Sequence, residues 1–130
     1  MTTEDKILKS LESAMTYLEN SKLTLNKKDE SELADDVWHV AAELEYTLFL
    51  FSITVQDEND KSKWKVNPKS KKLEVSPTLI TARDLLGKAE MSMKNKKLSD
   101  AYKHAYIARH HILRLQKDFA KKKREALKKK

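Results

Sequence analysis

Apolar side chains recur three or four residues apart over four stretches of the chain, and that spacing is typical of amphipathic helices. The first helix is predicted over residues 4–26, with Thr2 or Thr3 as its N-cap, and Asp29 or Ser31 is predicted to cap the second. The inward positions predicted for the first helix are Leu8, Leu11, Met15, Leu18, Lys22 and Leu25. Those of the second are Leu33, Val37, Val40, Leu44, Leu48, Phe51 and Val55.

The third helix is predicted to begin at Ser76-Pro77, because serine favours the N-cap and proline the first helical position. Ser99 is predicted to cap the fourth helix. The inward positions of these two helices are Leu79, Ala82, Leu86, Ala89 and Met93, followed by Ala101, Ala105, Ala108, Ile112, Leu115 and Phe119. The residues predicted to be buried are Leu11, Leu18, Val37, Leu44, Leu86, Ala105, Ile112 and Leu115.

The end of the second helix is apolar on nearly all sides, so one bundle core does not account for it. Residues 46–55 also fit a buried strand, but a helix is favoured because the periodic pattern runs unbroken from Leu33. Phe49, Leu50 and Ile53 are predicted to form a homodimer interface, with coverage by the following segment as the alternative.

Residues 57–75 alternate apolar and polar side chains on both sides of Asn67-Pro68, a pattern that fits a short β-hairpin. A lone two-stranded hairpin is marginal in water. Its apolar side chains would therefore rest on the bundle, namely Trp64, Val66, Leu73 and Val75.

An internal repeat relates the two halves of the chain. Residues 21–25 and the group Asp36, Val37, Trp38 and Ala41 resemble residues 87–91 and the group Asp100, Ala101, Tyr102 and Ala105. The offset between matching positions is 66 residues before the turn within each helical hairpin and 64 residues after it. The predicted fold is an all-α four-helix bundle of two repeated helical hairpins joined by a long basic connection. Residues 1–120 form one domain, and residues 121–130 form a basic tail that is expected to fray.

Composition supports long helices, because one glycine and two prolines leave little material for tight turns. The chain has no cysteine, no apolar run long enough to span a membrane and no apolar segment at its start. A cytoplasmic protein without a membrane span is expected.

Charge is divided between the ends of the chain. Residues 1–60 hold 14 Asp and Glu against 5 Lys, a net charge of −9, whereas residues 61–130 have a net charge of +16. The candidate nucleic-acid-binding residues are Lys63, Trp64, Lys65, Lys69, Lys71, Lys72, Lys121, Lys122, Lys123, Arg124, Lys128, Lys129 and Lys130. Because the excess is mostly lysine, binding would be driven by phosphates and would tolerate any sequence. For the tail, the alternative is a solvated end that keeps the protein soluble; for Trp64, it is an anchor for the hairpin.

Catalytic and metal-binding patterns are absent from the sequence. There is no glycine-rich phosphate loop and no cysteine nucleophile, and no Glu-x-x-His pair accompanies the histidines at 39, 104, 110 and 111. No catalytic residue, metal or cofactor is therefore predicted. Tyr102, Tyr106 and Leu113 form a second stripe beside Arg109 and Lys117, which fits either a stacking platform for bases or, as favoured here, the flank of the core.

Two families share features with the chain. Leu86-Gly87 followed by Ala101, Ala105 and Ala108 resembles a tetratricopeptide hairpin, although Glu90 replaces the family's tyrosine. Both halves also resemble the four-helix nucleotide-binding HEPN domains of prokaryotic defence and toxin systems, which favour alanine-rich second and fourth helices, as in residues 40–43 here. The Arg and His spacing of the ribonuclease members is missing at all four arginines, so the resemblance implies architecture and not ribonuclease activity.

The predicted function is a non-enzymatic helical module that docks on nucleic acid or another polyanion without sequence specificity. The alternative is a protein-interaction or self-assembling helical adapter, and a third hypothesis is an inactive or divergent relative of nucleotide-binding helical toxins.

Overall fold

A computed structural model describes residues 2–27, 30–55 and 74–128. Four α-helices lie within these ranges: α1 (Thr3–Asn26), α2 (Glu30–Thr54), α3 (Val75–Lys94) and α4 (Leu98–Lys128). The described residues contain no strand, so the all-α class is confirmed, and residues 46–54 are helical as favoured. None of the described helices has the length and apolar character needed to cross a membrane.

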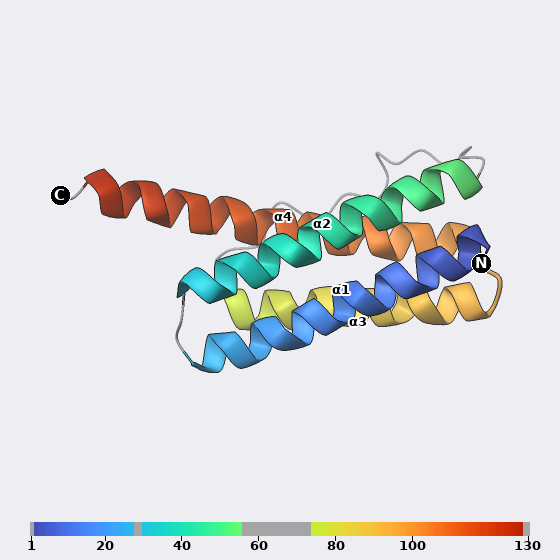
Figure 1. Cartoon of the computed structure of the whole chain (residues 1–130), viewed down its shortest axis with the longest axis horizontal. Coiled ribbons are helices and arrows are strands. Elements are labelled where there is room, and N and C mark those ends of the chain that lie inside the picture. The colour runs from blue at the N-terminus through green and yellow to red at the C-terminus, as the bar shows by residue number, and fades with distance from the viewer. Residues whose placement is uncertain (1, 28–29, 56–73, 129–130) are drawn as a thin grey trace.

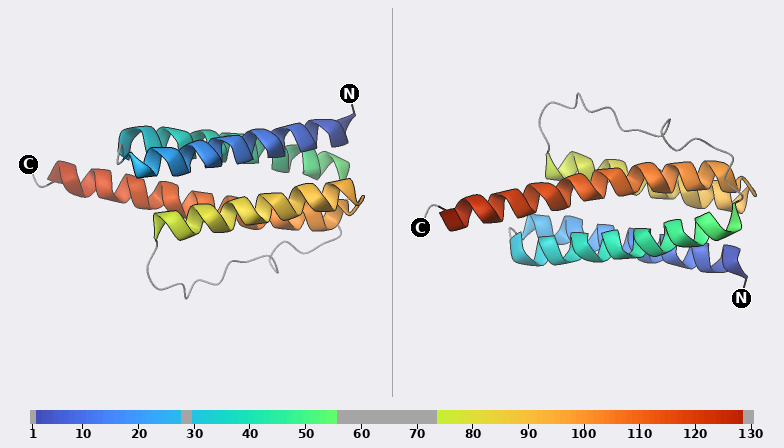
Figure 2. Two further views of the ribbon diagram at one scale, coloured as in Figure 1. Left: turned by 90° about the horizontal axis from the view of Figure 1, so that it is seen from below. Right: turned by 90° about the horizontal axis from the view of Figure 1, so that it is seen from above.

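The helices form a bundle of two layers, one with α1 and α2 and the other with α3 and α4 (Figure 2). Helix α1 packs against α2 and α3, and α4 packs against α3 and α2, so α1 and α4 occupy one diagonal. Each helix runs antiparallel to the neighbours it contacts (Figure 1). The end of α2 and the start of α3 therefore lie at opposite ends of the bundle.

The helix starts confirm one prediction and correct two. The Thr2 hydroxyl accepts a hydrogen bond from the Asp5 N–H while the Asp5 carboxylate accepts one from the Thr2 N–H, which forms a capping box on α1. Helix α3 begins at Val75, two residues before the predicted position of Pro77. Proline fits there as well, because backbone N–H groups of the first turn have no helical acceptor.

Val75 is helical, so its predicted place in a β-hairpin is wrong, and Glu74 is the N-cap of α3. The rest of that hairpin prediction falls on residues 57–73, which lie outside the described residues. Helix α4 begins at Leu98, so Ser99 is the second helical residue and not at the N-cap position that was predicted for it.

The core lies along the facing sides of the four helices. All eight residues predicted to be buried have no exposed surface, which confirms that list. In α1 the buried side is rotated slightly from the predicted stripe: Leu8, Met15 and Lys22 are only half-buried. The fully or nearly buried residues of α1 are Ile7, Ser10, Leu11, Ala14, Leu18, Ser21 and Thr24.

Hydroxyl groups join α1 to α2 inside this interface. The single proton of the Thr47 hydroxyl is shared between the Ser10 hydroxyl at 2.8 Å and the Glu43 carbonyl of its own helix at 2.7 Å, and Ser10 donates to the Ile7 carbonyl at 2.9 Å. Near the other end, the Thr24 hydroxyl donates to the Asp36 carboxylate at 2.8 Å. These bonds satisfy polar atoms that would otherwise be costly to bury.

Helix α4 continues through residues 121–128, where the sequence predicted a frayed tail. Alanine, leucine, lysine, arginine and glutamate all favour helices, so no residue in this segment stops the helix. All eight residues are exposed, and α4 extends beyond the other three helices at this end (Figure 1).

Candidate functional site

Positive side chains are aligned along the side of α4 that faces away from the core. Lys103 lies two residues from both Ala101 and Ala105, and Lys117 lies two residues from both Leu115 and Phe119. Two residues turn a helix by about 200°, so these lysines stand opposite the core stripe. The basic face of α4 comprises Lys103, Arg114, Lys117, Lys121, Arg124 and Lys128.

The exposed end of α4 concentrates this charge. Residues 121–128 contain five Lys and Arg and one Glu, a net charge of +4 on eight exposed residues. Lys122 also forms an ion pair with Asp118 at 3.1 Å, one helical turn back. The end of α4 therefore presents a strong positive charge along an exposed helix.

Burial, with nearby positive charge as the smaller cause, lowers the pKa of three histidines of α4. Partial burial lowers the pKa of His110, and the nearby cations Arg109 and Lys117 lower it further. Burial also lowers the pKa of His111, with Arg114 and His110 adding to the effect. For His104 burial again comes first, followed by Lys88 of α3, while Asp100 acts in the opposite direction. Positive charge close to these imidazoles disfavours their protonation.

Five of the predicted binding residues come together on the end of α4: Lys121, Lys122, Lys123, Arg124 and Lys128. The others fall outside the described residues, namely Lys63, Trp64, Lys65, Lys69, Lys71, Lys72, Lys129 and Lys130. Lys103 and Arg114 were not identified from the sequence. Their helical spacing with Lys117 and Lys121, opposite the alanine stripe, was the signal that would have found them.

Of the second stripe of α4, Tyr102 belongs to the flank of the core, as favoured from the sequence. This side chain is 2% exposed and stacks on Phe51 of α2, with ring centroids 5.3 Å apart and planes 4° from parallel. A platform that stacks on bases therefore does not include Tyr102. Tyr106 is partly buried, and its ring packs edge-on against the His110 ring, with ring centroids 4.8 Å apart.

A second surface lies on α2, on the side opposite its core residues. Phe49 and Ile53, both predicted to form a dimer interface, are 58% and 62% exposed. Leu50 was predicted with them, but it is 4% exposed and packs inside the monomer. Trp38 and Tyr46 are also exposed on α2.

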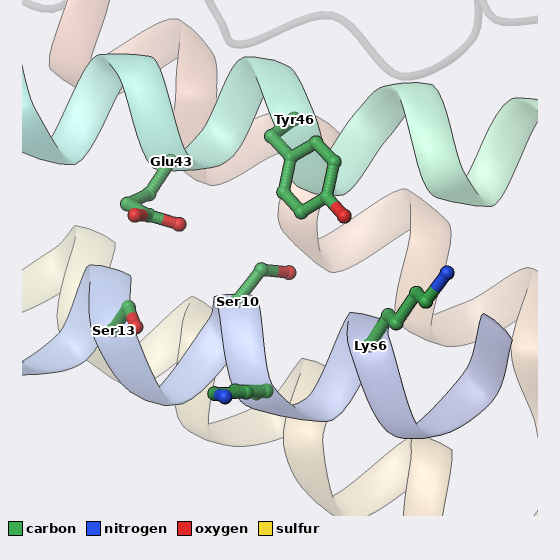
Figure 3. A pocket seen from close by; sticks show the side chains of 6 residues that line it. Lys6, Ser10, Ser13, Glu43 and Tyr46 are labelled. Atoms are coloured by element: carbon green, nitrogen blue, oxygen red, sulfur yellow. The ribbon is translucent and has the colours of Figure 1, made fainter. Parts of the chain in front are cut away.

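A shallow groove of about 340 Å³ lies between α1 and α2 (Figure 3). Its lining residues are Lys6, Lys9, Ser10, Ser13, Glu43 and Tyr46. The Ser10 hydroxyl already bonds to Ile7 and Thr47, and no base is paired with it to make it a nucleophile. Among residues 2–27, 30–55 and 74–128, no group of three or more His, Cys, Asp or Glu side chains is arranged to hold a metal ion.

Comparison of the chain with protein-family models, with curated proteins and with solved structures gave no match. The resemblances to tetratricopeptide hairpins and HEPN domains therefore rest on the quoted residues alone.

Proposed function

We propose that this protein is a non-enzymatic helical module that binds nucleic acid or another polyanion through the basic face of α4, without sequence specificity. The observation that carries the proposal is the exposed, helical end of α4, with a net charge of +4 over residues 121–128. A helix holds these charges at fixed spacing, which costs less entropy on binding than an unfolded tail would.

Lysine supplies most of this charge, which favours contacts to phosphate oxygens over readout of base edges. Each lysine or arginine that neutralises a phosphate releases condensed counterions. Affinity should therefore depend steeply on salt and little on sequence.

Fluorescence anisotropy with random single-stranded and duplex oligonucleotides, from low to physiological salt, tests the proposal. The logarithm of affinity should fall linearly with the logarithm of salt concentration, by about 0.7 per phosphate contact for single strands and about 0.9 for duplex. Replacing Lys121, Lys122, Lys123 and Arg124 with Gln should weaken binding to all sequences alike and reduce that slope.

A matched control separates a local site from net charge. Lys88, Lys94, Lys96 and Lys97 lie on α3 or just after it, and replacing these four with Gln removes the same charge. Binding should be reduced much less than by the α4 variant. Equal losses in both variants, or no binding at low salt, would contradict the proposal.

A protein-interaction adapter is the second candidate, and the exposed apolar side chains of α2 favour it.

We also infer that the bundle repeats one helical hairpin. Glu19 of α1 pairs with Arg83 of α3, and Glu45 of α2 pairs with Arg109 of α4. The pair between α2 and α4 spans 64 residues, which equals the sequence offset after the turn and favours duplication, whereas the pair between α1 and α3 spans 64 residues where the sequence offset is 66.

A further inference from the structure

The outer face of α2 is apolar although the bundle does not cover it. Eight large apolar residues are more than a third exposed in the described parts of the chain, and four of them lie on α2: Trp38, Tyr46, Phe49 and Ile53. Together with exposed Ala42 they are spaced three or four residues apart. Such spacing is typical of a seam that packs against another helix. We call these five residues the outer seam of α2.

The outer seam is distinct from the core side of the same helix. Ala42 lies two residues from both Val40 and Leu44, and Ile53 lies two residues from Phe51, which places the seam on the opposite side. Contiguous exposed apolar surface of this kind usually marks an interaction site, because leaving it in water is unfavourable.

The seam is complementary to itself when two copies run antiparallel. Its midpoint falls between Glu45 and Tyr46, so a two-fold axis there sets Trp38 opposite Ile53 of a second copy. The same axis sets Ala42 opposite Phe49, which pairs a small side chain with a large one. Alternation of small and large residues lets two helices approach closely.

Charge along α2 also favours the antiparallel arrangement. Helix α2 contains six Asp and Glu and no Lys or Arg, and four of the six lie before Trp38. Beside its second half, α1 contributes Lys6 and Lys9 to the groove that Tyr46 lines (Figure 3). In this antiparallel register Glu43 of one copy falls opposite Leu48 of the other, on the half of α2 beside which Lys6 and Lys9 lie, whereas parallel pairing would set the two acidic starts of α2 side by side.

The charge at the centre of the seam is already compensated. Glu45 would approach the two-fold axis, where an unpaired carboxylate would repel its copy. Its carboxylate accepts a hydrogen bond from Arg109 of α4 in the same chain, so two ion pairs would meet there instead of two bare anions.

We propose that the outer seam of α2 is an interface at which two copies of this chain associate through an antiparallel two-fold contact. The interface uses α2 and the adjacent edge of α1, and it leaves the end of α4 free.

Sedimentation velocity over a wide concentration range tests the association. The native chain should shift from monomer to dimer as concentration rises. Replacing Phe49 and Ile53 with Gln should weaken the dimer at least about tenfold, because each loses burial worth more than the ~1.4 kcal/mol that a tenfold change requires. The matched control replaces Ile80 and Met91 of α3, which are 46% and 63% exposed, with Gln.

The control variant should associate as the native chain does. Equal weakening in both variants would indicate nonspecific association and overturn the proposal. A native chain that stays monomeric at every concentration would also overturn it. The seam would then be covered by residues 56–73 or by a different protein.

Cysteine crosslinking tests the orientation, since the chain has no cysteine of its own. Tyr46→Cys lies next to the axis and should form an intermolecular disulfide on mild oxidation. Trp38→Cys alone should not, because 15 residues of helix, or about 22 Å, would separate the two sulfurs. The double variant Trp38→Cys with Ile53→Cys should crosslink, whereas efficient crosslinking by Trp38→Cys alone would overturn the antiparallel arrangement.

The test is independent of polyanion binding. The Phe49 and Ile53 variant retains every residue of the basic face of α4, so it should bind a short oligonucleotide as the native chain does. Loss of the dimer with retained oligonucleotide binding supports the interface. Loss of the dimer together with oligonucleotide binding would contradict the proposal that the seam and the basic face are separate sites.

Discussion

At the scale of single residues, the largest departure from the sequence prediction is the burial of small hydroxyl side chains. Ser10 and Ser21 were not predicted to face the core, because a hydrophobic pattern treats serine as polar. Each donates its hydroxyl to a backbone carbonyl one turn earlier, Ile7 and Tyr17 respectively, at 2.9 Å. A hydroxyl satisfied within its own helix costs little to bury, so apolar periodicity alone misses it.

Gly87 provides a test at this scale. It lies inside α3, its backbone does not require a positive φ, and an added Cβ would meet nothing within 4 Å. Gly87→Ala should therefore raise the free energy of unfolding by about 0.5–1 kcal/mol, because alanine loses less backbone entropy in a helix. Chemical denaturation measures this change, and a destabilised variant would show that the surroundings of Gly87 are tighter than described.

At the scale of helices, the core side of each element could be predicted because apolar spacing follows directly from helix geometry. The residues at which each helix begins were predicted less accurately, because local cap preferences compete with tertiary packing. Ser76-Pro77 is a favourable start signal, but α3 begins at Val75, which is partly buried against the core. The basic face of α4 was identified only at its end, because Lys103 and Arg114 are isolated in the sequence and become neighbours only on a long helix.

Helix α4 also predicts how stability depends on pH. Burial and nearby cations lower the folded-state pKa of His104, His110 and His111 below the ordinary value near 6.5. The unfolded chain then binds more protons than the folded one at acidic pH, so stability rises with pH in that window. The free energy of unfolding should therefore decrease as the pH falls from about 7 through 6.5 toward the lower folded values.

Urea denaturation between about pH 5 and 8 measures this decrease. Replacing the three histidines with Gln should flatten the dependence in this range. Carboxylates such as Glu19, whose pKa is lowered by its hydrogen bond from Arg83, act at still lower pH and would not obscure it. Imidazole NMR titrations that gave values above 6.5 for all three would contradict the prediction.

At the scale of the molecule, the fold brings opposite charges side by side. Helix α2 has a net charge of −6, and α4, with nine Lys and Arg and three Asp and Glu, has a net charge of +6. The two helices pack against each other and are joined by the pair Glu45 and Arg109. The charge division seen along the sequence is therefore partly compensated within one chain, which the sequence did not reveal because it does not specify which helices are neighbours.

This arrangement predicts how the acidic start of α2 affects polyanion binding. That start lies toward the same end of the bundle as the end of α4, so Glu32 and Asp35 reduce the positive field there (Figure 1). Glu32→Gln with Asp35→Asn should tighten oligonucleotide binding at low salt by up to about twofold per charge removed, since two unit charges about 10 Å apart in water interact by ~0.4 kcal/mol. The gain should disappear at high salt, because the Debye length falls below that distance.

Glu12→Gln with Glu90→Gln removes the same charge from α1 and α3 and serves as the control. Anisotropy measured on both variants distinguishes the outcomes: an equal gain would mean that only net charge matters, and no gain in the α2 variant would mean that the end of α4 is not where the polyanion binds.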